Sequence, residues 1–123
     1  MDCTKTVLVV DDADIVRTMV SFMLEKAGYN TLSGIDGMDA LTFLDGREVD
    51  LVITDLNMPN MDGSELITKI RSKESYQYIP AVLFMADDAD DKDSVRRACG
   101  ATMVFDKNNI KEKLLPAIKK LIG

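Results

Sequence analysis

Two apolar segments of this chain run directly into aspartate residues. Residues 7–10, Val-Leu-Val-Val, are followed by Asp11 and Asp12, and residues 51–54, Leu-Val-Ile-Thr, are followed by Asp55. Runs of β-branched and aliphatic residues predict strands that are buried on both faces, as in parallel α/β sheets. Such sheets bind ligands at the carboxyl ends of their strands. The three carboxylates are therefore expected to meet at one edge of a sheet.

A carboxylate cluster of this kind requires a positive charge beside it. At a separation of about 5 Å and an effective dielectric constant of about 20, each like-charge pair costs on the order of 3 kcal/mol. A hard divalent cation with oxygen ligands could offset this cost. Lys107, which follows the last strand-like segment, is the second candidate.

The composition limits the class of protein. With 123 residues, the chain is expected to form one domain over residues 1–123, and its 46% hydrophobic content predicts a globular fold. The net charge of −6 disfavours direct binding to nucleic acid or to an anionic membrane. Apolar runs stay well short of the 18 or so residues of a membrane span. The amino terminus does not resemble a signal peptide.

Histidine and cysteine usage narrows the chemistry. The chain has no histidine, which excludes Ser-His-Asp and Cys-His catalysis and a role as a phosphohistidine carrier. Any phosphohistidine must therefore belong to a partner. The two cysteines, Cys3 and Cys99, have no metal-ligand spacing, and a reduced, cytoplasmic setting is the simplest interpretation.

Strand-like and helix-like segments alternate five times, which is typical of βα units on a parallel sheet. The predicted strands cover residues 6–10, 30–35, 50–54, 81–85 and 102–105, and the first four helices cover 13–27, 38–44, 64–72 and 92–99. Asn109 and Glu112 match a capping box that would open a fifth helix. Pro116 lies inside the apolar pattern of that helix and predicts a kink or a late helix start.

The order and spacing of these residues resemble the receiver domain of two-component response regulators, of the stand-alone chemotaxis type. The resemblance covers essentially the whole chain and depends on residues 9–12 (Val-Val-Asp-Asp), the loop 55–63, Ile79-Pro80, Gly100-Ala101 and Lys107. It implies a flavodoxin-like fold, with a five-stranded parallel sheet in the order 2-1-3-4-5 flanked by five helices. It also implies a signalling domain rather than an enzyme, apart from its own phosphotransfer and dephosphorylation.

The same resemblance implies a role for each site residue. Asp55 would accept a phosphoryl group from a phosphohistidine of a sensor histidine kinase or a histidine phosphotransfer protein. Asp11, Asp12, Asp55 and the backbone carbonyl of Asn57 would hold Mg²⁺. Lys107 would pair with Asp55 before modification and with the phosphoryl group afterwards.

Two positions depart from the family pattern. Typical receivers carry Thr or Ser at the end of the fourth strand, where this chain has Met85, which cannot donate a hydrogen bond. They also carry Tyr or Phe three residues before the lysine, where this chain has Val104. The neighbouring Phe105 is expected to point to the opposite face of its strand. An atypical switch is therefore predicted.

The family proline after the lysine is replaced by Asn108. Because a non-proline cis bond costs about 2.5–4 kcal/mol, a trans bond is expected before Asn108. With the hydroxyl missing, the backbone N–H groups of Ala86 and Asp87 are the alternative donors expected to bind the phosphoryl group.

These residues also have simpler structural explanations. Asp11 and Asp12 could be acids favoured at a helix N-terminus, and Lys107 could be an ordinary surface lysine. The acidic stretch 87–93 fails the EF-hand pattern and is expected to be a solvated loop. The chain could also be a phosphate-independent receiver-like module. A flavin carrier is disfavoured because the acids after the first strand would repel its phosphate.

The expected target surface is the helix at 92–99, the strand at 102–105 and the last helix. This part of the chain is more basic than the rest; its basic residues are Arg96, Arg97, Lys111, Lys113, Lys119 and Lys120. A solvated helix face is the plain alternative for the same residues.

Overall fold

A single parallel β-sheet organises the chain. The structure is a computed structural model that describes residues 4–85 and 92–123. Its strands are β1 (Thr6–Val10), β2 (Asn30–Gly34), β3 (Leu51–Asp55), β4 (Ala81–Met85) and β5 (Met103–Asp106). They lie in the order β2-β1-β3-β4-β5, and every neighbouring pair is parallel. The predicted strand order is confirmed.

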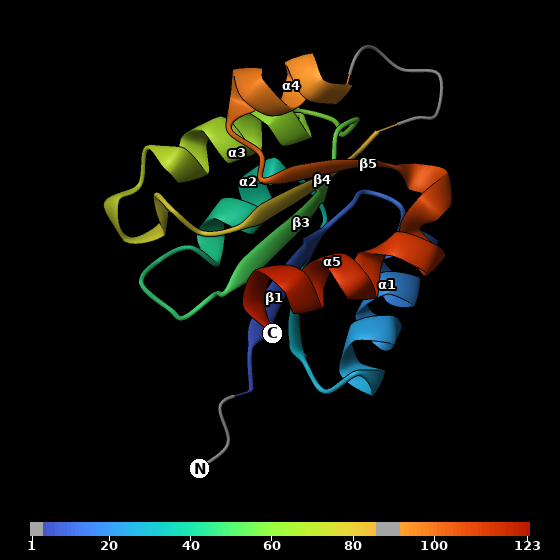
Figure 1. The fold of residues 1–123 in the computed structure, drawn as a ribbon. Helices are drawn as coiled ribbons and strands as arrows, with labels where there is room; N and C mark the ends of the chain where they lie inside the picture. Colours follow the sequence, from blue (N-terminus) through green and yellow to red (C-terminus); the bar gives the residue numbers. More distant parts are fainter. Residues whose placement is uncertain (1–3, 86–91) are drawn as a thin grey trace.

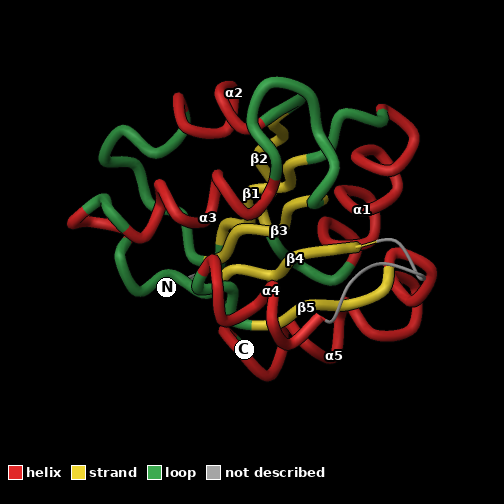
Figure 2. Tube along the Cα trace, turned by 90° about the horizontal axis from the view of Figure 1, so that it is seen from above, coloured by secondary structure: helices red, strands yellow, loops and turns green. Residues whose placement is uncertain are grey.

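Helices cover both faces of this sheet. They are α1 (Asp14–Lys26), α2 (Gly37–Thr42), α3 (Gly63–Arg71), α4 (Lys92–Cys99) and α5 (Ile110–Ile122), with short 3₁₀ turns η1 (Glu74–Tyr76) and η2 (Lys107–Asn109). Helices α1 and α5 lie on one face, and α2, α3 and α4 lie on the other (Figure 1 and Figure 2). The carboxyl ends of the strands therefore share one edge, between two helical layers.

The alternating side chains of each strand supply both cores. Val9 of β1 and Ile53 of β3 pack with α1 and α5. Leu8 and Val52, their neighbours in the chain, pack with α2 and α3. Because β1 and β3 are buried on both faces, neither strand can slip by one residue without placing an apolar set on the wrong face.

Most predicted element boundaries are within two residues of the structure. The strand 81–85 and the helix 92–99 agree with it fully. Asp55 is the last residue of β3 instead of the residue after it. Sequence patterns fix the middle of an element better than its ends, because end residues fray and depend on capping.

Two expectations for the last helix were wrong. The predicted capping box does not form, because Asn109 closes the 3₁₀ turn η2 and its side chain makes no capping hydrogen bond. The late start at Pro116 is also wrong, since α5 begins at Ile110 and continues through the proline. Burial of Leu114 and Ile118 outweighs the loss of one backbone donor. The alternative kink stays a prediction.

Within residues 4–85 and 92–123, no helix combines the length and the apolar character needed to cross a membrane.

Candidate functional site

Parallel pairing of β1 with β3 brings two of the predicted aspartates together. Val10 lies opposite Thr54 in the register, so the next residues, Asp11 and Asp55, leave the sheet side by side. Asp12 follows in the turn, and carboxylate oxygens of all three residues lie within 4.8 Å of one another. The expected meeting of these three carboxylates at one sheet edge is confirmed.

The three carboxylates differ in their exposure to solvent. Asp11 is 3% exposed and Asp55 is 4% exposed, whereas Asp12 lies on the surface. Burial raises the pKa of the Asp11 carboxyl above its ordinary value; the backbone N–H of Ala13 opposes this rise and the charge of Asp55 adds to it. The site therefore combines two buried carboxylates with one on the surface.

Lys107 supplies the cation of the unmodified site. Its Nζ atom lies 2.9 Å from Asp55 Oδ2, as a hydrogen-bond donor, and 3.3 Å from Asp11 Oδ2. Burial alone would lower the pKa of the Lys107 ammonium, but the hydrogen bond to Asp55 and the charges of Asp55 and Asp11 raise it. One ammonium thus neutralises part of the charge of two carboxylates.

The β3–α3 loop closes tightly over the end of β3. The Gly63 N–H donates to the Leu56 carbonyl at 2.8 Å. Asp62 caps α3 by accepting from the Glu65 N–H at 2.8 Å. A Cβ atom at Gly63 would lie 2.3 Å from the Asp55 carbonyl oxygen, so this position requires glycine for close approach. Asn57 lies in the same loop and is exposed; metal ligation by its carbonyl stays a prediction.

Hydrogen bonds to the side chain and to the main chain of Asp11 hold the turn between β1 and α1. Asp11 Oδ1 accepts from the Ala13 N–H at 2.9 Å, and the Asp11 N–H donates to the Gly34 carbonyl at 3.2 Å. The Arg17 guanidinium donates to the Asp11 carbonyl at 2.7 Å and also contacts the Asp14 carboxylate. Sequence reasoning missed Arg17; its signal was a lone basic residue one turn into a helix that follows an acidic turn.

Met85 and Val104, the two positions predicted to be atypical, lie in one apolar cluster. Met85 is 1% exposed and packs with Ile67 and Cys99, and Val104 packs against the same cluster. Phe105 points to the opposite face, where its ring lies 6.3 Å from that of Phe84, as predicted. Neither Met85 nor Val104 carries a hydrogen-bonding group, so the cluster offers no polar link to Asp55.

Two predictions concern the loops beside this cluster. No peptide bond in the described part of the chain is cis, so the trans bond expected before Asn108 is confirmed. Ala86 and Asp87, the predicted phosphoryl-binding donors, lie outside the described residues.

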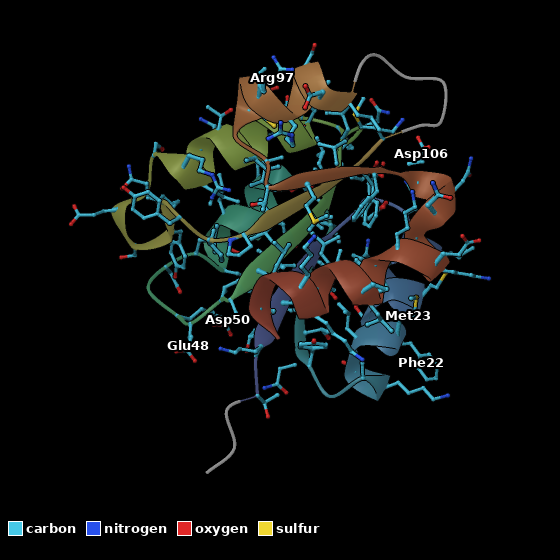
Figure 3. All side chains as sticks on the ribbon, viewed as in Figure 1. Phe22, Met23, Glu48, Asp50, Arg97 and Asp106 are labelled. Carbon is cyan, nitrogen blue, oxygen red and sulfur yellow. The ribbon has the colours of Figure 1, made fainter. Side chains whose placement is uncertain are left out.

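An ion pair that the sequence did not suggest links α4 to β5. Lys92 Nζ lies 2.6 Å from Asp106 Oδ1. Asp106 is the last residue of β5 (Figure 3) and lies two residues after Val104, a spacing that places both on one face of a strand. Because side chains alternate between the two faces of a strand, the spacing of two residues from Val104 could have predicted the face on which Asp106 lies.

The fold and the site together define a class. A flavodoxin-like sheet with an acidic cluster and a lysine at the carboxyl edge of its strands is a phosphoryl- or cation-handling α/β domain. The family model of the response regulator receiver domain matches residues 7–119. The chain belongs to this family, whose members are signalling domains rather than true enzymes.

Curated relatives include proteins of similar and of greater length. The chain is 28% identical to Protein PilG of Pseudomonas aeruginosa over 113 residues, which is 92% of this chain and 84% of PilG. It is 37% identical to chemotaxis protein CheY-3 of Vibrio cholerae over 82 residues, covering 66% of this chain and 63% of CheY-3. It is also 35% identical to part of the V. cholerae sensor kinase/phosphatase CqsS. This match covers 69% of this chain and 12% of CqsS.

Solved structures of receivers match the whole fold. The structure of V. cholerae chemotaxis protein CheY4 has a TM-score of 0.90 at 32% identity and covers 98% of this chain and 100% of that chain. The Thermotoga maritima response regulator TrrA, solved in complex with Mg²⁺ and BeF, has a TM-score of 0.84 at 31% identity and covers 97% and 100%.

Proposed function

We propose that this domain accepts a phosphoryl group on Asp55 from a partner phosphohistidine. One observation carries the proposal: carboxylates of Asp11, Asp12 and Asp55 lie within 4.8 Å of one another, and Lys107 Nζ lies 2.9 Å from Asp55. One ammonium does not balance three carboxylates, so a further cation is needed before a dianionic phosphoryl group can approach Asp55. Asp12 lies on the surface and is the carboxylate of the site most accessible to a phosphoryl donor.

The donor set fits Mg²⁺. Three carboxylates that can each offer one oxygen form a hard, anionic site, and Mg²⁺ prefers oxygen ligands and retains waters. Asp11, Asp12 and Asp55 would hold the ion, with the carbonyl of Asn57 as a further oxygen. When bound, the ion neutralises charge on the phosphoryl oxygens.

The residues of the chain then perform the transfer. A carboxylate oxygen of Asp55 attacks the phosphorus, the phosphorus–nitrogen bond of the phosphohistidine breaks, and its electron pair stays on the partner imidazole. The product is an acyl phosphate on Asp55. The Lys107 ammonium, which bonds Asp55 Oδ2 beforehand, would bind a phosphoryl oxygen afterwards.

The proposed partners are a histidine kinase or a histidine phosphotransfer protein upstream and a target protein downstream. Matches inside sensor kinases, CqsS and Escherichia coli RcsC, support the first. Basic residues on α4 and α5 support α4, β5 and α5 as the target face. A cytoplasmic location belongs to the same proposal and is supported by the free, buried thiol of Cys99.

Phosphorylation is tested by intact mass. After incubation with Mg²⁺ and acetyl phosphate or phosphoramidate, we expect the protein to gain the mass of one phosphoryl group. Asp55→Asn should gain none, and chelation of Mg²⁺ should abolish the gain. Equal modification of Asp55→Asn would assign the phosphoryl group to another residue. No gain with either donor would refute the proposal.

A second candidate function is a phosphate-independent binding module. Met85 favours it, because the usual hydroxyl is absent from the end of β4 and the side chain is buried among apolar neighbours. The carboxylate cluster and its lysine disfavour it, since a module without phosphotransfer has no use for their mutual repulsion.

The proposed function includes an altered structural response of α4 and β5 to phosphorylation. Because Met85 and Val104 cannot hydrogen-bond a phosphoryl group, phosphorylation should move few amide signals in α4 and β5. We expect ¹⁵N NMR shift changes to concentrate on residues near Asp11, Asp55 and Lys107. Met85→Thr restores a donor at the same position, and its shift changes should extend into α4. Large changes in α4 and β5 of the wild type would contradict the altered structural response.

A further inference from the structure

Arg17 is a partly buried cation that hydrogen-bonds the main chain of the acidic turn. Its side chain is 16% exposed, and one guanidinium nitrogen donates to the Asp11 carbonyl at 2.7 Å. The Arg17 N–H donates to the Ala13 carbonyl at 3.0 Å, which is the ordinary backbone bond of the first helical turn. The guanidinium is therefore the group that links Arg17 to the turn that carries Asp11 and Asp12.

Two other hydrogen bonds hold this turn, from the Ala13 N–H to Asp11 Oδ1 and from the Asp11 N–H to the Gly34 carbonyl, and neither comes from a side chain of α1. The N-cap residue of α1, Ala13, makes no side-chain capping hydrogen bond. Helices α2 and α3 are capped by Asp36 and Asp62, whereas α5, like α1, has no side-chain cap. In α1, the Arg17 guanidinium supplies a contact that ties the helix to the main chain of the turn.

The second contact of Arg17 cannot account for its burial. Asp14, its carboxylate partner, is 86% exposed, and such surface ion pairs contribute little. A hydrogen bond from a charged donor to a carbonyl, in a partly buried position, is the stronger interaction. Its loss would also leave the Asp11 carbonyl without this donor.

We propose that Arg17 is a positioning residue for the metal ligands. It fixes the Asp11 carbonyl, and through it the directions of the Asp11 and Asp12 carboxylates toward Asp55. Mg²⁺ tolerates little departure from octahedral geometry, so small rotations of the turn should weaken binding. Residues that orient ligands in this way typically change metal affinity by 10- to 100-fold. The inference rests on the proposed function.

The test measures Mg²⁺ affinity directly, by calorimetric or NMR titration of the unphosphorylated protein. Arg17→Met keeps the aliphatic stem and removes the donors, and we expect its Kd for Mg²⁺ to rise about 10-fold. Arg17→Lys keeps one donor and should recover part of the affinity. Asp14→Asn removes only the surface partner and should bind within about twofold of the wild type.

Each outcome decides a different point. A purely structural role would lower the unfolding midpoint of Arg17→Met in urea but leave the Kd of the folded protein unchanged, which would overturn the inference. Equal weakening in Asp14→Asn would assign the effect to the surface pair and also overturn it. A wild type that binds no Mg²⁺ would refute the proposed function, and this inference with it.

Discussion

Gly63→Ala is expected to lower the free energy of unfolding by about 2–4 kcal/mol and to abolish phosphorylation. The new Cβ atom would lie 2.3 Å from the Asp55 carbonyl oxygen and 2.7 Å from Leu83 Cδ1. The Asp55 carbonyl belongs to the backbone at the end of a buried strand, so moving it would cost considerable free energy. The strain would fall on Asp55, which must keep its place beside Lys107. Urea denaturation followed by circular dichroism, with intact mass after phosphorylation, measures both effects.

Gly37→Ala is the matched control. Gly37 and Gly63 are each the first residue of a helix and each follow a capping aspartate, Asp36 and Asp62. The three atoms nearest to an added Cβ at Gly37 all belong to the Met61 side chain, with the sulfur at 2.8 Å, Cγ at 2.9 Å and Cβ at 3.0 Å. The sulfur and Cγ can rotate away and leave only the Cβ contact, so we expect a smaller stability loss, of about 1 kcal/mol. Equal losses in both variants would show that the strand carbonyl is not the cause.

The acidic cluster could be predicted from the sequence because it depends on local order and one topological rule. An apolar run that ends in aspartate identifies a strand end, and parallel strands place their ends at one edge. Asp11, Asp12 and Asp55 therefore needed no tertiary detail. Lys107 needed only its position after the last strand.

Other features depend on contacts between residues far apart in the sequence or on competing local geometry. The Lys92–Asp106 pair requires α4 to lie against β5, which no local pattern specifies. The capping box at Asn109 failed because the preceding 3₁₀ turn took up the residues that would have formed an extended cap. Arg17 is a helix residue of ordinary type, and its contact with the Asp11 carbonyl appears only in the folded structure.

Lys107→Met is expected to lower the free energy of unfolding at pH 7 by about 2–3 kcal/mol. Removing one partner of a buried pair costs about 3–5 kcal/mol, and we place the value lower because the Lys107 side chain is 32% exposed. The variant leaves Asp11 and Asp55, both nearly buried, without their ammonium. In an Asp55→Asn background, the same change should cost less than half as much, because one carboxylate is already gone. Urea denaturation of the four proteins completes the cycle.

The stability loss of Lys107→Met is expected to depend on pH. The folded-state pKa of Asp11 already lies above its ordinary value, so this carboxyl destabilises the fold as pH rises through that pKa. Without Lys107 the pKa should rise further, and the deficit of Lys107→Met should shrink as the pH falls from 7 toward 4. Lys120→Met, at an exposed position of α5, should show neither the loss nor its pH dependence. A deficit that stays constant with pH would mean that Lys107 stabilises the fold by packing rather than by charge.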